Sequence, residues 1–201
     1  MDAPTDEQLL KDYLRGDTAS FELLVRRHAH ELYQFAVRFT CDSVVAEDVV
    51  QDTFLQVHTS AASFDPQRCF KPWLFTVAAN KARDSLRRRK RRRELPFDAQ
   101  VSGDDDGGAN FVALLASEED APDEGLLLED KRRIVRLAVD RMPAVLREVL
   151  ILAYYHRFPY RDIAEIVGIP LGTVKSRLHA AVAAFTRCYR ASVQEHNRRE
   201  P

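Results

Sequence analysis

Apolar side chains recur every three or four residues over much of the chain, which is the spacing of one face of an α-helix. In the stretch 21–39 this face consists of Phe21, Leu24, Val25, His28, Leu32, Phe35, Ala36 and Phe39. The spacing predicts a long helix there, and Thr5 with Gln8 resembles a capping box that opens a shorter helix before it. Further helices are expected over 44–58 and from Lys71 into the arginine-rich run that follows.

The second half of the chain is also helical in pattern. Helices are expected over 126–141, from Pro143 to about His156, from Pro159 to near Gly168, and from Leu171 past Phe185. Glycine is scarce, with 7 in 201 residues, which favours helices over sheets. The segment Phe64–Arg68 has a proline and no periodicity, and this predicts a loop in the first half.

Charge is distributed unevenly along the chain, although the net charge is only −1. Residues 1–93 carry 16 basic and 13 acidic side chains, a net +3, and residues 126–201 carry 14 and 8, a net +6. Residues 94–125 hold ten acidic side chains and no basic one. Like charges repel and glycines add chain entropy, so this stretch is predicted to be a linker. We expect an all-α fold with two small helical domains, 1–93 and 126–201, joined by a flexible acidic linker.

Residues 160–179 have the layout of a helix-turn-helix, which makes the second domain a candidate for binding duplex DNA. Ala164 is small where two helices must cross, and Gly168 can take the left-handed backbone of a tight turn. The polar and cationic side chains of the second helix are Thr173, Lys175, Ser176, Arg177 and His179. Such side chains can reach phosphates and base edges in a major groove. An αα-hairpin with a solvated basic face is the alternative.

A dense basic run in the first domain follows a group of aromatic residues. Lys81–Arg93 holds nine basic residues and one acid. Aromatic rings beside cations suit single-stranded DNA, because unstacked bases can lie on the rings. Core packing is the alternative for Trp73 and Phe75, and we expect it for at least one of them. The candidate DNA contacts are Phe64, Arg68, Lys71, Trp73, Asn80, Arg83 and Arg87.

The helix expected over 44–58 differs from the basic segments described above, because one of its faces is acidic and partly apolar. This face consists of Asp48, Gln51, Asp52 and Leu55. A negative surface would repel the phosphates of DNA, so we expect this face to bind a basic protein partner instead. An ordinary amphipathic helix is the alternative.

Together these segments resemble an extracytoplasmic-function sigma factor. The likeness covers nearly the whole chain and rests on the ordered combination of Asp17–Leu24, Ala46–Leu55, Phe70–Asp84, Met142–Leu150 and Gly172–Leu178. Such factors bind core RNA polymerase and direct initiation at promoters with minus-ten and minus-thirty-five elements. In the family, the first domain (region 2) binds polymerase and opens the minus-ten element, and the second (region 4) reads the minus-thirty-five element.

The resemblance implies roles for the candidate residues. Asp48, Gln51, Asp52 and Leu55 match the helix that docks on the clamp helices of the polymerase's largest subunit. The loop Phe64–Cys69, with Asn80 and Arg83, matches the part that captures a flipped minus-ten base, and 173–179 matches the helix that reads the minus-thirty-five element. Many relatives have an arginine where this chain has Ala180, so a family consensus does not transfer directly.

The implied partners are core RNA polymerase, through its clamp helices and flap region, promoter DNA, and in many relatives an anti-sigma factor. No catalytic constellation, cofactor motif or metal-ligand spacing is present, so we expect neither an enzyme nor a cofactor. Three scattered cysteines fit a cytoplasmic protein, and no apolar run approaches the ~20 residues of a membrane span. A stand-alone helix-turn-helix regulator is the competing function.

Overall fold

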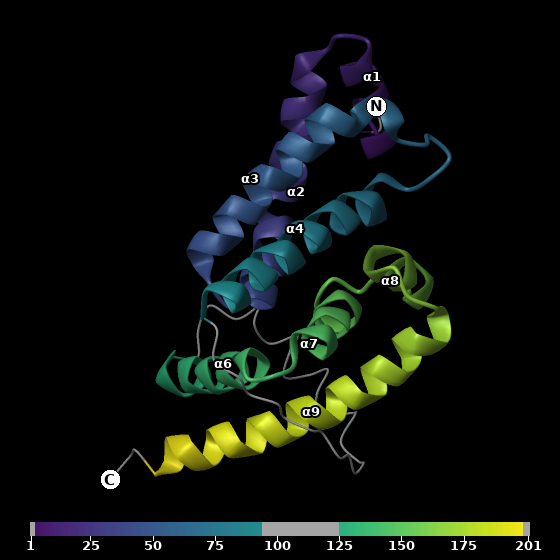
Figure 1. The fold of residues 1–201 in the computed structure, drawn as a ribbon. Helices are drawn as coiled ribbons and strands as arrows, with labels where there is room; N and C mark the ends of the chain where they lie inside the picture. Colours follow the sequence, from purple (N-terminus) through teal and green to yellow (C-terminus); the bar gives the residue numbers. More distant parts are fainter. Residues whose placement is uncertain (1–2, 94–124, 199–201) are drawn as a thin grey trace. The chain divides into compact units, whose positions relative to one another are not determined.

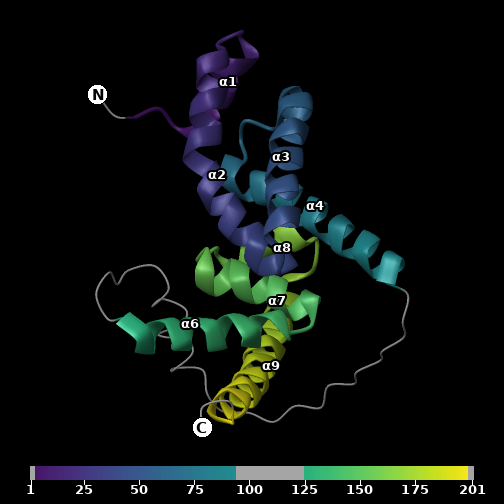
Figure 2. The same ribbon diagram turned by 90° about the vertical axis from the view of Figure 1, so that its left-hand side faces the viewer.

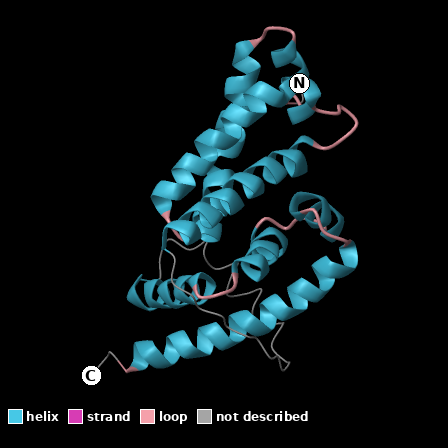
Figure 3. Ribbon diagram, viewed as in Figure 1, coloured by secondary structure: helices cyan, strands magenta, loops and turns pink. Residues whose placement is uncertain are grey.

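The computed structural model describes residues 3–93 and 125–198, and every regular element in these ranges is a helix (Figure 3). Contacts between helices divide this part of the chain into two units, each of which is described by itself. The all-α fold with two helical domains is therefore confirmed. The acidic segment predicted as a linker lies outside the described residues, apart from Gly125, which begins a helix.

The N-terminal unit is built around one long central helix. Its helices are α1 (Asp6–Leu14), α2 (Thr18–Thr40), α3 (Ser43–Ser60) and α4 (Phe70–Arg93). Helix α2 packs against the other three, and α3 also packs against α4 (Figure 1). The core is the predicted apolar face of α2, completed by residues of the other helices. Its largest fully buried side chains are Leu10, Leu24, Leu32, Phe35, Phe39, Phe70, Leu74 and Phe75.

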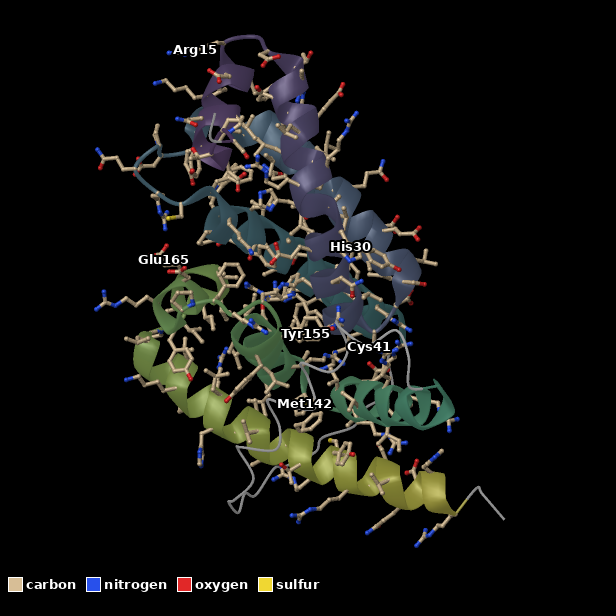
Figure 4. The ribbon with its side chains drawn as sticks, turned by 180° about the vertical axis from the view of Figure 1, so that it is seen from behind. Arg15, His30, Cys41, Met142, Tyr155 and Glu165 are labelled. Carbon is tan, nitrogen blue, oxygen red and sulfur yellow. The ribbon has the colours of Figure 1, made fainter. Side chains whose placement is uncertain are left out.

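Side-chain caps begin the first three helices, where backbone amides lack intrahelical acceptors. The predicted capping box of Thr5 and Gln8 is present at α1. Asp17 caps α2 and Asp42 caps α3. Between them, Cys41 ends α2 in the left-handed conformation, with φ of 58°, so that α3 folds back beside α2 (Figures 2 and 4).

The chain between α3 and α4 is the loop that the sequence predicted. A short 3₁₀ helix, η1 (Ala61–Ser63), ends α3, and residues 64–69 follow without regular structure. Asp65 closes a turn here, since its carboxylate accepts from Gln67 N at 2.9 Å and its carbonyl from Arg68 N at 3.0 Å. The loop ends at Phe70, which is fully buried.

The C-terminal unit consists of α6 (Gly125–Asp140), α7 (Ala144–Leu150), the π-helical η2 (Ile151–Tyr155), α8 (Tyr160–Val167) and α9 (Leu171–Asn197). Helices α6 and α7 both pack on the long α9. One regular helix from Pro143 to His156 was expected, but its second half widens into the π form. The amide of His156 reaches back five residues to Ile151 O at 3.1 Å, and Arg157 then turns left-handed at φ 52°.

Helices α8 and α9 form the predicted helix-turn-helix. Gly168 turns the chain at φ +74°, the conformation for which glycine was expected there. The turn is closed by Ile169 N, which donates to Ala164 O at 3.0 Å. Ile163, Val174 and Leu178 are buried, as the sequence predicted for the contacts between these helices.

Candidate functional site

The outer face of α3 carries a line of exposed side chains that we call the α3 stripe. It consists of Val44, Asp48, Gln51, Asp52 and Leu55. Val44 is 67% exposed and Leu55 60% exposed, so apolar side chains flank the acidic centre of the stripe. Val44 was not among the residues of this face that the sequence predicted, although it lies four residues before Asp48 and so on the same side of the helix.

The opposite side of α3 explains why the stripe points outward. Val49, Thr53 and Val57 pack into the core of the unit, and each is at most 1% exposed. Asp48 and Asp52 make no ion pair with any residue that the structure describes. Two solvated carboxylates between exposed apolar side chains suit a partner with a basic, partly apolar surface.

The aromatic residues around the 64–69 loop divide into core and surface. Phe70 and Phe75 are fully buried, so their faces are closed to a base, and Phe75 confirms that one of the Trp73 and Phe75 pair is core. Phe64 and Trp73 are half-buried, with ring centroids 4.9 Å apart. These two rings border the loop and are the aromatic surface that a base could reach.

Two of the cations that the sequence predicted to contact DNA already have partners within the N-terminal unit. Lys71 Nζ lies 2.7 Å from Glu31 Oε1. Arg87 pairs with Asp84 of its own helix at 3.2 Å. These contacts between partly exposed side chains are weak enough for DNA phosphates to compete with them.

The other candidates lie on α4 and on the loop before it. Asn80 and Arg68 are exposed, and Arg83 is half-buried. Asn80 and Arg83 are three residues apart and so share one side of α4. Beyond them, Arg88, Lys90 and Arg91 are exposed and continue the positive charge along the helix.

The first turns of α9 present the predicted polar side chains opposite a buried apolar face. Lys175, Ser176 and His179 are exposed, while Thr173 and Arg177 are half-buried. The Ser176 hydroxyl donates to Thr173 O at 3.1 Å, which leaves its oxygen lone pairs available to an outside donor. Ala180 is half-buried.

The far end of α9 is fastened to the end of α6. Arg141 donates to both carboxylate oxygens of Glu195, at 3.1 and 2.6 Å, and this hydrogen bonding raises the pKa of Arg141. Nearby, burial raises the pKa of the Cys188 thiol. This end of α9 is therefore held to the end of α6 by an ion pair.

Metal chemistry has no support in the part of the chain that the structure describes, where no group of three or more His, Cys, Asp or Glu side chains could hold an ion. In the same ranges, no helix combines the length and the apolar character that crossing a membrane requires.

The two helical units coincide with the matches to known protein families. The family model of sigma-70 region 2 matches residues 24–92, and that of sigma-70 region 4 matches residues 132–185. The RNA polymerase sigma-H factor of Pseudomonas aeruginosa is 30% identical over 192 residues, which cover 94% of this chain and 96% of that protein. The ECF RNA polymerase sigma-E factor of Escherichia coli is 32% identical over 182 residues, covering 90% and 92%.

Solved structures lead to the same family. CnrH, in complex with the cytosolic domain of CnrY, superposes with a TM-score of 0.64 at 25% identity, covering 94% of this chain and 99% of that one. The sigma factor RpoE from Bartonella quintana, in complex with the anti-sigma factor NepR, gives a TM-score of 0.63 at 25% identity, covering 85% and 96%.

These matches define the class of protein: the chain belongs to the RNA polymerase sigma factor family. Within that family it is a member of the ECF group, and it directs promoter-specific initiation of transcription by RNA polymerase. The stand-alone regulator that the helix-turn-helix also allowed is not favoured.

Proposed function

We propose that this sigma factor docks on core polymerase through the α3 stripe and reads the promoter with two other surfaces. The observation that carries this proposal is the separation of charge within the N-terminal unit. The solvated acids lie on the outer face of α3, whereas the cations and the accessible rings lie on α4 and the loop before it. An acidic face repels DNA phosphates, so the two surfaces suit different partners.

The minus-ten element would be bound by the 64–69 loop and α4. A flipped base needs a ring to stack on and a hydrogen-bonding side chain to read its edge. Phe64 and Trp73 offer the rings, Asn80 offers an amide with donors and an acceptor, and Arg83 offers charge. Arg68, Lys71 and Arg87 then hold the phosphate backbone, which adds affinity without reading sequence.

The minus-thirty-five element would be bound in its major groove by the first turns of α9. Lys175 and Arg177 supply phosphate or guanine contacts, and Thr173, Ser176 and His179 supply shorter hydrogen-bonding groups. Ala180 offers only a methyl group, so it cannot make the contact with a base or phosphate that an arginine would make at this position.

The protein itself performs no catalysis in this proposal, because bond formation belongs to the polymerase. It acts in the cytoplasm, where core polymerase transcribes. An anti-sigma protein is a natural regulator, as in the complex of RpoE with the anti-sigma factor NepR, and the exposed α3 stripe is a surface that such a protein could cover.

Site-specific photocrosslinking tests these assignments directly. A benzophenone amino acid replaces Phe64, Asp48 or Lys175, one at a time, in holoenzyme bound to a promoter fragment that this factor transcribes. We expect crosslinks to the minus-ten non-template strand, the largest polymerase subunit and the upstream duplex, respectively. Leu137, which is 41% exposed on α6, is the control position. Crosslinks from Phe64 to protein alone would contradict the minus-ten assignment.

A further inference from the structure

Helix α1 begins with two adjacent carboxylates that both point to other helices of its unit. Asp6 Oδ2 lies 2.7 Å from Nε2 of His28, and Oδ1 lies 2.5 Å from Arg27. Arg27 also donates to Pro4 O at 3.1 Å. The His28 side chain is only 5% exposed, and hydrogen bonds to charged groups in such places are among the stronger ones. Asp6 therefore fastens the start of α1 to α2.

Glu7 reaches a more distant part of the sequence. Its Oε1 accepts from the backbone N–H of Phe70 at 2.8 Å, across 63 residues. Phe70 is the first residue of α4, and the first amides of a helix have no acceptor within the helix. A carboxylate at this place satisfies a free amide, and the partial positive charge of the helix start favours it.

Phe70 connects this carboxylate to the proposed minus-ten surface. Its buried ring contacts the rings of His28, Phe64 and Trp73, with centroids 5.7, 6.0 and 5.8 Å away. It also ends the 64–69 loop and begins the helix that carries Asn80. A shift of Phe70 would therefore move the loop, the two accessible rings and the start of α4 together.

We propose that Glu7 is a positioning residue for promoter opening: by holding the amide of Phe70, it sets the 64–69 loop in the arrangement that captures an unpaired base. This inference rests on the minus-ten role proposed above for that loop. Glu7 lies on α1 and is not part of the α3 stripe, so binding to core polymerase should not depend on it.

Three variants separate the hydrogen bond from the charge. Glu7→Gln keeps the length and an acceptor oxygen but removes the charge. Glu7→Asp keeps the charge on a side chain one methylene shorter, and Glu7→Ala removes both. Asp12→Ala is the matched control, because it removes another carboxylate of helix α1. Among the residues that the structure describes, the only side-chain partner of Asp12 is the exposed Arg15, at 3.4 Å.

Each variant is assembled with core polymerase on a promoter fragment that the wild-type factor transcribes. Open-complex formation is followed by permanganate reactivity of unpaired thymines, and affinity for core polymerase by fluorescence anisotropy. Losing a hydrogen bond to a charged group corresponds to roughly a tenfold effect. We expect Glu7→Ala and Glu7→Asp to slow opening by about tenfold, and Glu7→Gln and Asp12→Ala to stay within about threefold of wild type. Affinity for core should be unchanged in all four.

Wild-type opening by Glu7→Ala would overturn the proposal. So would equal losses in Glu7→Gln and Glu7→Ala, because the hydrogen bond would then not be the cause. A parallel fall in core affinity or in thermal unfolding temperature for Glu7→Ala, without recovery in Glu7→Gln, would reduce Glu7 to a general stabilising residue.

Phe64→Ala, measured beside these variants, separates this inference from the function on which it rests. Slow opening by Phe64→Ala together with normal opening by Glu7→Ala would leave the minus-ten assignment standing and overturn the positioning role. Normal opening by Phe64→Ala would contradict the minus-ten assignment, and the positioning role with it.

Discussion

Asp42 and Arg89 join the start of α3 to the arginine-rich end of α4, with Arg89 Nη1 donating to Asp42 Oδ2 at 3.1 Å. The other oxygen of Asp42 accepts from the amides of Val44 and Val45, at 3.1 and 3.2 Å. One carboxylate therefore begins the helix that carries the α3 stripe and also neutralises one cation of the basic run. Arg89 is structural within a segment whose composition alone suggests nucleic-acid binding.

Asp42→Ala is expected to destabilise the N-terminal unit. It removes both capping bonds and the contact with Arg89, and losing such a cap costs about 1–2 kcal/mol of unfolding free energy. Asp42→Asn keeps a side chain that caps equally well, so it should lose about 0.5 kcal/mol or less, mainly from the partly exposed ion pair. Urea unfolding followed by circular dichroism distinguishes them, and equal stabilities would contradict the capping role.

Reversing the charge of the α3 stripe should abolish polymerase binding while the fold persists. Asp48→Lys with Asp52→Lys would bring like charges together at the docking surface, which costs several kcal/mol, so affinity should fall by about a hundredfold or more. The control is Asp12→Lys with Glu22→Lys, which makes the same charge change elsewhere in the unit. Unchanged binding of core polymerase by the stripe variant would remove α3 from the interface.

Replacing Lys175 and Arg177 of α9 by alanine should weaken binding of holoenzyme to promoter DNA and reduce its salt dependence. Each lost phosphate contact lowers the slope of log K against log salt by about 0.9, so two lost contacts lower it by about 1.8. Arg136→Ala with Arg190→Ala removes the same charge from exposed sites of that unit. Equal slopes for both pairs would show that Lys175 and Arg177 do not contact the backbone of DNA.

Most of the fold could be predicted from the sequence because its signals are local. Helical periodicity located the apolar face of α2, the capping box located the start of α1, and a single glycine located the turn between α8 and α9. The π-helical end of α7 carries no such signal, because apolar residues continue through 151–155 with the composition of an ordinary helix.

The parts of the candidate site that escaped prediction depend on contacts between distant residues. No local pattern pairs Glu7 with Phe70, or Lys71 with Glu31. Phe70 lies close in sequence to Phe64, Trp73 and Phe75, and its burial depends on packing against residues distant in sequence, such as His28 of α2. The sequence alone indicated a basic surface with aromatic residues, but not which of these side chains are buried or already paired within the protein.

Two glycines of the helix-turn-helix should respond to alanine in opposite directions. Neither Gly168 nor Gly172 has any atom within 4 Å of an added Cβ, so space does not decide the outcome. At Gly168 a φ of +74° strains alanine, and we expect a loss of about 1–2 kcal/mol. Gly172 lies within α9, where alanine should stabilise by up to about 1 kcal/mol. Thermal unfolding of the two variants measures both signs, and a loss at both positions would contradict this backbone account.

The cysteines should differ in reactivity because the thiolate is the nucleophile. Burial raises the pKa of Cys188, so at pH 8 less of it is ionised than of an ordinary thiol, and its ionised fraction grows only as the pH rises further. Cys69 is exposed on the loop before α4. Iodoacetamide should modify Cys69 first and Cys188 later, as peptide mass spectrometry would show. In urea the difference should vanish, and faster labelling of Cys188 in the native protein would contradict its burial.

Multi-round transcription with purified core polymerase, on a pool of genomic promoter fragments, tests the central claim most directly. With the protein present, discrete transcripts should appear that are absent without it, and their start sites should lie downstream of shared minus-ten and minus-thirty-five sequences. No protein-dependent transcript, together with tight binding of duplex DNA by the protein alone, would contradict the account and favour a stand-alone regulator.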